Sequence, residues 1–207
     1  MFYSTDKEPP LSPDPFKQLI VPRPIGWIST ISKDGAVNLA PYSFFNAIAD
    51  DPPMVGFGSG GSKPDRLYKD SWANIEETGE FVFNLATWDT RRQMNTTSGS
   101  YPAGVDEFRE AGLTPAPSKL VKPPRVAEAP VHFECRHFKT IELPADDPSH
   151  PNCFIIGQVI GIHIDDSLIK DGRVDIVAAR PIARLGYSLY AIVDNKFPMR
   201  RPDTMTS

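Results

Sequence analysis

The chain reads RPIGWISTISKDGAVNLAPYSFFN from residue 23 to residue 46, and this stretch decides the fold. Residues 25–31 are rich in β-branched and aromatic side chains, which is typical of a strand. Lys33-Asp34-Gly35 has the composition of a tight turn, and the residues from Val37 onwards can pair back as a second strand. The stretch therefore predicts an antiparallel β-hairpin near the start of the chain.

Directly after this hairpin, residues 40–46 (APYSFFN) combine a proline, aromatic rings, a hydroxyl and an amide. We expect Pro41 to interrupt the strand, because proline has no N–H to donate to a neighbouring strand. The polar groups and flat rings that follow are the features that a planar polar ligand requires. The segment therefore predicts a binding site for such a ligand.

The composition excludes several classes of partner. The chain has 22 basic and 26 acidic residues mixed along 207 residues, with a net charge of −4, and it contains no basic stripe for nucleic acid and no polybasic membrane anchor. Its first ten residues lack the apolar core of a signal peptide, and no apolar run approaches the roughly 20 residues that cross a bilayer. We expect a soluble cytoplasmic protein in which Cys135 and Cys153 are reduced thiols.

The 22 prolines argue against long helices and favour many short strands. Strand-like runs occur at residues 25–31, 36–40, 54–58, 81–85, 131–141, 153–164 and 182–185. Their number predicts a mostly β protein, an antiparallel barrel with a few short helices. The apolar run around Val159 predicts a central strand that is buried on both faces.

The remaining segments predict how the chain is organised. The clearest helix starts near Asp70 or Ser71, either of which can cap it, and ends at Thr78-Gly79. A second helical or irregular stretch is expected over residues 89–112. Six prolines in the first 24 residues predict an extended arm over residues 1–24, followed by a barrel domain over residues 25–195 and a tail over residues 196–207.

Residues 58–63 (GSGGSK) are rich in glycine and serine. No Gly-Lys-Ser/Thr opens a helix here, so the segment does not match a nucleotide P-loop. Its hydroxyls and free amides, with Lys69 and the start of the following helix, can still receive a phosphate. A flexible loop capped by its own serines explains the same residues, and both interpretations stay open.

Two other kinds of chemistry fit the sequence poorly. A zinc site would draw on His132, Cys135, His137 and Cys153, but His132 and Cys135 point to opposite faces of a strand and no Cys-x-x-Cys motif is present. No serine lies in a Gly-x-Ser-x-Gly motif, and neither cysteine has the local sequence of a nucleophile. We expect neither a metal site nor a hydrolase, and His163 fits a structural histidine or a ring that lines a cofactor pocket.

Taken together, several segments in this order resemble the flavin reductase-like family. They are RPIGWIST (23–30), NLAPYSFFN (38–46), DPP (51–53), KDSWANI (69–75), TGEFVFN (78–84), DEF (106–108), AGLTP (111–115), IGQV (156–159) and ARLGYSLY (183–190). The resemblance covers nearly the whole chain. It implies a split β-barrel with Greek-key-like antiparallel strands and short flanking helices, which forms a homodimer and binds FMN.

The resemblance also implies an activity and a binding site. FMN would accept hydride from NADH or NADPH at flavin N5 and pass electrons to free flavin, a partner protein or another acceptor. We expect no catalytic acid or base, because the cofactor carries the chemistry. The implied cofactor-binding residues are Trp27, Thr30, Asn38, Ala40, Pro41, Tyr42, Ser43, Phe44, Asn46, Ser59, Ser62, Lys69, Asp70 and Ser71.

Within this set, residues 38–46 would border the isoalloxazine ring, whose faces suit Trp27 or the phenylalanines. The residues from Ser59 to Ser71 would reach the ribityl chain and the phosphate, with help from Arg91 or Arg92. Tyr187 replaces a glycine that is common in the family, and it would narrow the site or stack on it.

Two alternatives remain. One is a flavoredoxin-like carrier that keeps FMN and receives electrons from a protein partner. The other is a non-catalytic split barrel that binds haem or another ligand, with His132, His137, His150 or His163 as the axial residue.

Overall fold

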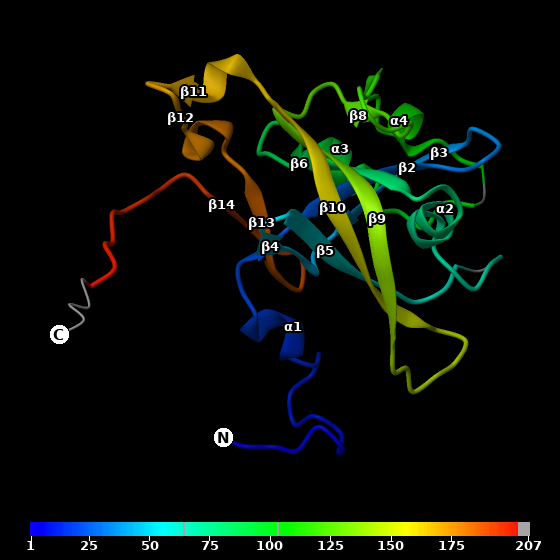
Figure 1. Ribbon diagram of the computed structural model, residues 1–207. Coiled ribbons are helices and arrows are strands. Elements are labelled where there is room, and N and C mark those ends of the chain that lie inside the picture. Colours follow the sequence, from blue (N-terminus) through cyan, green and yellow to red (C-terminus); the bar gives the residue numbers. More distant parts are fainter. Residues whose placement is uncertain (64, 103, 203–207) are drawn as a thin grey trace.

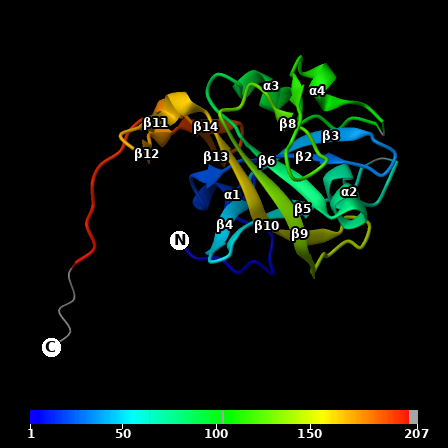
Figure 2. The same ribbon diagram turned by 45° about the horizontal axis from the view of Figure 1, so that its top comes forward.

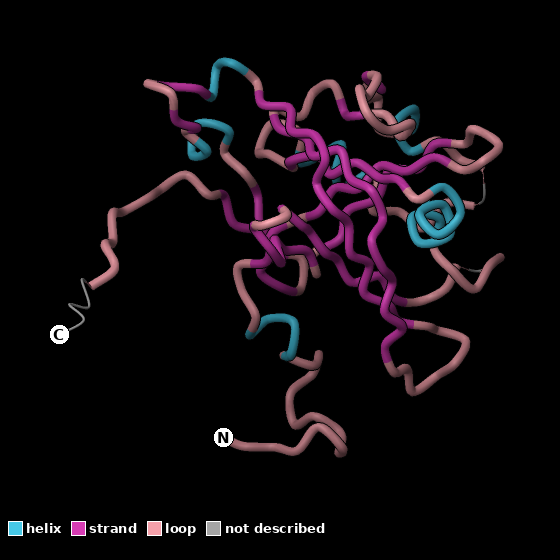
Figure 3. Tube along the Cα trace, viewed as in Figure 1, coloured by secondary structure: helices cyan, strands magenta, loops and turns pink. Residues whose placement is uncertain are grey.

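A seven-stranded antiparallel sheet lies at the centre of the computed structural model, which describes residues 1–63, 65–102 and 104–202 (Figure 1). In spatial order its strands are β3 (Val37–Tyr42), β2 (Gly26–Ile31), β6 (Glu80–Leu85), β9 (Val131–Leu143), β10 (Asn152–Ile164), β5 (Pro53–Gly60) and β4 (Phe45–Asp50). Figure 3 shows strands through the middle of the molecule and short helices around them. The predicted mostly β barrel is therefore confirmed.

The two edge strands of this sheet are neighbours in the chain. β3 and β4 lie at opposite edges of the sheet, yet only Ser43 and Phe44 separate them. The sheet must therefore curl until its edges approach each other, and the Phe44 carbonyl accepts a hydrogen bond of 2.8 Å from the Gly58 amide near this seam. The curled sheet with its seam is the split barrel.

The predicted strand break at Pro41 is wrong, because β3 continues through Pro41 to Tyr42. A proline is tolerated there because an edge strand has one side on which a missing N–H costs no ladder hydrogen bond. The next strand, β4, was not predicted. Of its residues only Phe45 is buried, so the alternation of apolar and polar side chains that marks a half-buried strand is missing.

The strand β10 is not buried on both faces as its apolar sequence predicts. Its buried residues alternate, at Cys153, Ile155, Gly157 and Val159, and the side chains between them are partly or fully exposed. The inward face joins the core within the barrel, where the largest fully buried rings include Phe57 and Phe81. Cys135 and Cys153 are both buried free thiols.

Smaller elements cover the ends of the barrel. The strands β1 (Arg23–Pro24), β13 (Ile182–Gly186) and β14 (Leu189–Ile192) form a three-stranded sheet, and two short hairpins are β7 (Pro115–Ala116) with β8 (Arg125–Val126) and β11 (Ile169–Lys170) with β12 (Arg173–Val174). The helices are α1 (Phe16–Leu19), α2 (Asp70–Thr78), α3 (Arg91–Thr96) and α4 (Glu107–Glu110), with 3₁₀ turns at Asp166–Leu168 and Ile176–Ala179. Among the described residues, no helix is both long and apolar enough to cross a membrane.

In the turn between β11 and β12, Asp171 and Gly172 are both at positive φ. Two expectations about these elements can be compared with the structure. The stretch 89–112 contains two short helices, α3 and α4. The predicted arm is not extended throughout, because helix α1 lies within it. Residues 203–207 of the predicted tail lie outside the described residues.

The packing of β10 against β6 generates a test of the barrel core. A Cβ atom added at Gly157 would lie 2.3 Å from Cε1 of Phe81, which is fully buried and cannot move aside. Gly157→Ala is expected to lower the free energy of unfolding by about 1–3 kcal/mol in urea denaturation. The matched control is Gly161→Ala, whose Cβ would lie 3.2 Å from Cδ1 of the exposed Leu120 and at an ordinary contact distance of 3.6 Å from Cβ of Glu134. Equal stability of the two variants would contradict this packing.

Candidate functional site

The start of helix α2 is open to a ligand. Its N-cap residue is Lys69, which makes no side-chain capping bond, so the predicted cap by Asp70 or Ser71 is wrong. The predicted end is confirmed, because Gly79 takes a left-handed conformation and donates its N–H to the Ile75 carbonyl. An uncapped helix start leaves backbone N–H groups free and carries a partial positive charge, both of which favour an anion.

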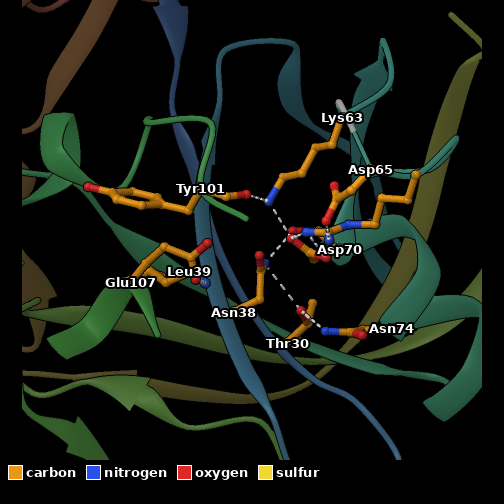
Figure 4. Close-up of polar contacts among 11 residues, drawn as sticks. Thr30, Asn38, Leu39, Lys63, Asp65, Asp70, Asn74, Tyr101 and Glu107 are labelled. Atoms are coloured by element: carbon orange, nitrogen blue, oxygen red, sulfur yellow. Dashed lines mark hydrogen bonds and ion pairs between the residues drawn. The ribbon is translucent and has the colours of Figure 1, made fainter. Parts of the chain in front are cut away.

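A buried hydrogen-bond network holds α2 on the β2–β3 hairpin (Figure 4). Asn38 Nδ2 donates to Ser71 Oγ at 2.8 Å and to Thr30 Oγ1 at 3.4 Å. Asn74 Nδ2 donates to the same Thr30 Oγ1 at 3.0 Å. All four residues are buried, and Figures 1 and 2 both place α2 beside this hairpin. The network therefore fixes where the helix begins.

The charges at the start of α2 are unevenly paired. The Asp70 carboxylate forms ion pairs with Lys63 Nζ at 2.5 Å and with Arg66 Nη2 at 2.6 Å. Lys63 Nζ also donates a hydrogen bond to the Tyr101 carbonyl at 3.0 Å. Lys69 has no carboxylate partner among the described residues. Its pKa is lowered, first by burial and then by the positive charges of nearby lysines. Lys69 is thus the cation that remains available to a phosphate.

A small cavity of about 250 Å³ opens at this helix start. Its lining residues are Asn38, Ala40, Pro41, Tyr42, Ser62, Lys63, Lys69, Asp70, Thr97, Ser98, Gly99, Ser100 and Glu107. The Glu107 carboxylate accepts the Leu39 N–H at 3.1 Å, and burial raises its pKa. Burial also raises the pKa of Tyr42 to about 12, so this phenol is neutral and can donate a hydrogen bond.

A larger cavity of about 860 Å³ adjoins the small one, since Pro41 and Ser98 line both. Its lining residues are Pro13, Asp14, Phe16, Lys17, Gln18, Arg23, Ile25, Pro41, Ser43, Met94, Asn95, Ser98, Arg184, Gly186, Tyr187, Ser188 and Tyr190. Lys17, Arg23 and Arg184 give it a positive character, and rings and methylene groups supply apolar surface. An elongated ligand with an anionic end and a flat end matches this pair of cavities.

The structure brings together eight of the predicted site residues as lining of these cavities. They are Asn38, Ala40, Pro41, Tyr42, Ser43, Ser62, Lys69 and Asp70. Thr30 and Ser71 lie behind the small cavity, in the network that fixes α2.

Four predicted residues lie elsewhere. Trp27 is fully buried in a second core, and its Nε1 donates to Thr97 Oγ1 at 2.9 Å, so its ring face is not offered to a ligand. Ser59 is buried beside Tyr42, and it lines neither cavity. Phe44 and Asn46 are exposed, with Phe44 at the seam under the Arg23 guanidinium.

Other lining residues were missed by the sequence analysis. Met94, Asn95 and Ser98 come from α3 and the loop after it, which the sequence analysis treats only as part of a helical or irregular stretch over residues 89–112. Arg23 and Arg184 meet only because β1 pairs with β13, which no local pattern reveals. Tyr187 does line the large cavity, and its φ of 48° is left-handed. Arg91 and Arg92 do not line the small cavity.

Comparisons with known proteins agree with this architecture. The family model described as "Flavin reductase like domain" matches residues 18–178. A protein of Aquifex aeolicus is 42% identical over 173 residues, which is 83% of this chain and 85% of that protein. A protein of Halalkalibacterium halodurans is 36% identical over 183 residues, which is 88% of this chain and 87% of that protein.

Solved structures show the same fold. Nitrilotriacetate monooxygenase component B from Bacillus cereus superposes with a TM-score of 0.86 at 30% identity, over 96% of this chain and 98% of that chain. The flavoredoxin of Desulfovibrio vulgaris (Miyazaki F) superposes with a TM-score of 0.76 at 21% identity, over 99% of both chains. The chain belongs to the flavin reductase-like family and has its split-barrel fold.

Proposed function

We propose that this protein binds FMN across the two joined cavities and acts as an oxidoreductase of the flavin reductase type. The observation that carries the proposal is the continuous path from an uncapped helix start, with Lys69 beside it, to a larger cavity with apolar and polar lining. The family match and the flavoprotein fold of its structural relatives support the same ligand.

In this proposal the small cavity holds the phosphate and the ribityl chain. The first amides of α2, Lys69 and the Ser62 hydroxyl would bind the phosphate. Asp70 does not oppose this, because Lys63 and Arg66 already compensate its charge. Glu107, on the opposite wall, offers acceptor oxygens that suit hydroxyl groups of the ribityl chain.

The larger cavity would hold the isoalloxazine ring. Pro41 and Met94 offer apolar surface for the ring, and the Ser43 and Ser98 hydroxyls offer partners for its polar edge. Tyr187 lines the same cavity and would leave less space for the second substrate, the nicotinamide nucleotide.

The chemistry that follows needs little from the protein besides placement. Bound FMN would supply the hydride-accepting centre, taking a hydride from NADH or NADPH and passing the electrons to a further acceptor. The residues of the chain bind and orient the two planar groups and shield them from water, which converts an encounter of two molecules into a reaction within one complex. Homodimer formation, a cytoplasmic location and the boundaries 1–24, 25–195 and 196–207 remain predictions.

The haem alternative finds no support at this site, because none of the described residues that line the two cavities is a histidine. The carrier alternative shares the FMN site and differs only in the source of electrons. Reduction of the bound FMN by NADH or NADPH therefore distinguishes the two functions.

The first prediction is that NADH or NADPH bleaches the flavin absorption band of the FMN-loaded protein in anaerobic stopped-flow experiments. The riboflavin complex and free FMN serve as references for the spectrum. If neither nucleotide bleaches the band while dithionite does, the reductase proposal fails and the carrier alternative is favoured.

The second prediction concerns Lys69. Lys69→Ala is expected to weaken FMN binding about tenfold to a hundredfold in fluorescence titrations, because a charge-assisted contact is lost. Binding of riboflavin, which has no phosphate, should change little. Lys33→Ala is the matched control, because Lys33 is exposed and pairs only with Glu77. Equal losses for FMN and riboflavin would place the phosphate elsewhere.

Ser71 is unsuited to this test, because its Oγ accepts the buried Asn38 amide at 2.8 Å. An alanine there would leave a buried donor without its partner and would lower stability together with affinity.

A further inference from the structure

A third cavity, of about 350 Å³, lies next to the large one. Its lining residues are Trp88, Arg91, Arg92, Met94, Asn95, Ile182, Tyr190, Ala191 and Ile192. Met94, Asn95 and Tyr190 also line the large cavity, so the two cavities are adjacent. A ligand bound in the large cavity therefore has a place into which it can extend.

The walls of the third cavity are apolar and aromatic. Met94 and Ile182 are buried parts of the second core, and Ile192 packs against that core. The rings of Trp88 and Tyr190 and the methyl group of Ala191 add to these walls, and Asn95 is the uncharged polar side chain among them. A flat heteroaromatic group fits such walls, because its faces can contact both rings and aliphatic side chains.

The rim of the cavity is positively charged. The Arg91 guanidinium lies 3.7 Å from the centre of the Trp88 ring and donates to the Trp88 carbonyl at 2.5 Å, which holds it in place. The Arg180 guanidinium lies 5.4 Å from the same ring. Neither Arg91 nor Arg92 forms an ion pair with a carboxylate within the described part of the chain. These arginines are therefore available to an anion.

We propose that the third cavity binds the adenosine-phosphate half of the nicotinamide dinucleotide, with the base between the apolar walls and the phosphates at Arg91 and Arg92. This inference rests on the proposed function, in which the nicotinamide reaches the isoalloxazine ring that the large cavity holds. Residues 56–61 (GFGSGG) match the G-x-G-x-x-G pattern, but most of them lie within the antiparallel strand β5 and no helix begins directly after them. They therefore do not form the strand–turn–helix unit that binds a dinucleotide in a Rossmann fold, and its phosphates need another cationic site. Planar guanidinium groups suit phosphates because they donate two hydrogen bonds in parallel.

The proposal also gives a role to two arginines that the flavin site does not use. Sequence analysis expected Arg91 or Arg92 to assist the FMN phosphate, but they line the third cavity and not the small one. Their proposed ligand is a different phosphate, on the electron donor.

The test uses ADP as the probe and FMN-loaded protein. In calorimetric titrations ADP is expected to bind without releasing FMN, and in steady-state assays to compete with the nicotinamide nucleotide. Arg92→Gln should lower the affinity for ADP and raise the KM for the nicotinamide nucleotide, each roughly tenfold. The kcat at saturation should not change, because in this proposal the exposed Arg92 binds the donor and does not contact the reacting groups. Arg92→Lys should restore part of the loss.

The matched control is Arg136→Gln, an exposed arginine on β9 that lines none of the three cavities, and it should behave as wild type. The proposal is overturned if ADP does not bind, if ADP displaces FMN, or if Arg92→Gln and the Arg91→Gln/Arg92→Gln double variant keep wild-type ADP affinity and KM. If ADP binds but neither nucleotide reduces the flavin, the proposed electron donor is wrong. The ADP titrations of the variants then still show whether ADP binds in the third cavity.

Discussion

The hydrogen bond from Asn38 Nδ2 to Ser71 Oγ, 2.8 Å long and fully buried, is the contact on which the site depends. It links β3 to the first turn of α2, and the Thr30 hydroxyl extends the link to Asn74 one turn later. Buried polar groups are costly unless they are paired, so this network admits one position of the helix on the hairpin. The uncapped helix start and Lys69 are thereby held at the edge of the small cavity.

Closure of the barrel supplies the second constraint. Because two residues join edge strands β3 and β4, the seam of the split barrel must lie beside Pro41, Ser43 and Phe44. Pro41 and Ser43 line the large cavity, and Pro41 is shared with the small one. The same topological feature therefore closes the barrel and places the two cavities next to each other. The third cavity adjoins the large one, because Met94, Asn95 and Tyr190 line both.

Local sequence was sufficient for much of the fold and for part of the site. Runs rich in β-branched and aromatic residues predicted the inner strands, and Gly79 predicted the end of α2, because both signals arise within a few residues. Strand β4 has one buried residue and carries no such signal. The family resemblance implied that Trp27 contacts the ligand, but Trp27 is buried in the second core, where its Nε1 donates to Thr97, 70 residues away in the chain. Arg23 and Arg184 likewise meet through strand pairing, which a single sequence does not display.

The most direct test of the central claim is a crystal structure of the protein with FMN. The account predicts the phosphate within hydrogen-bonding distance of the first amides of α2 and of Lys69 Nζ, with the isoalloxazine ring in the large cavity beside Pro41 and Ser43. A phosphate bound at Arg91 and Arg92, or a ring outside the large cavity, would contradict it.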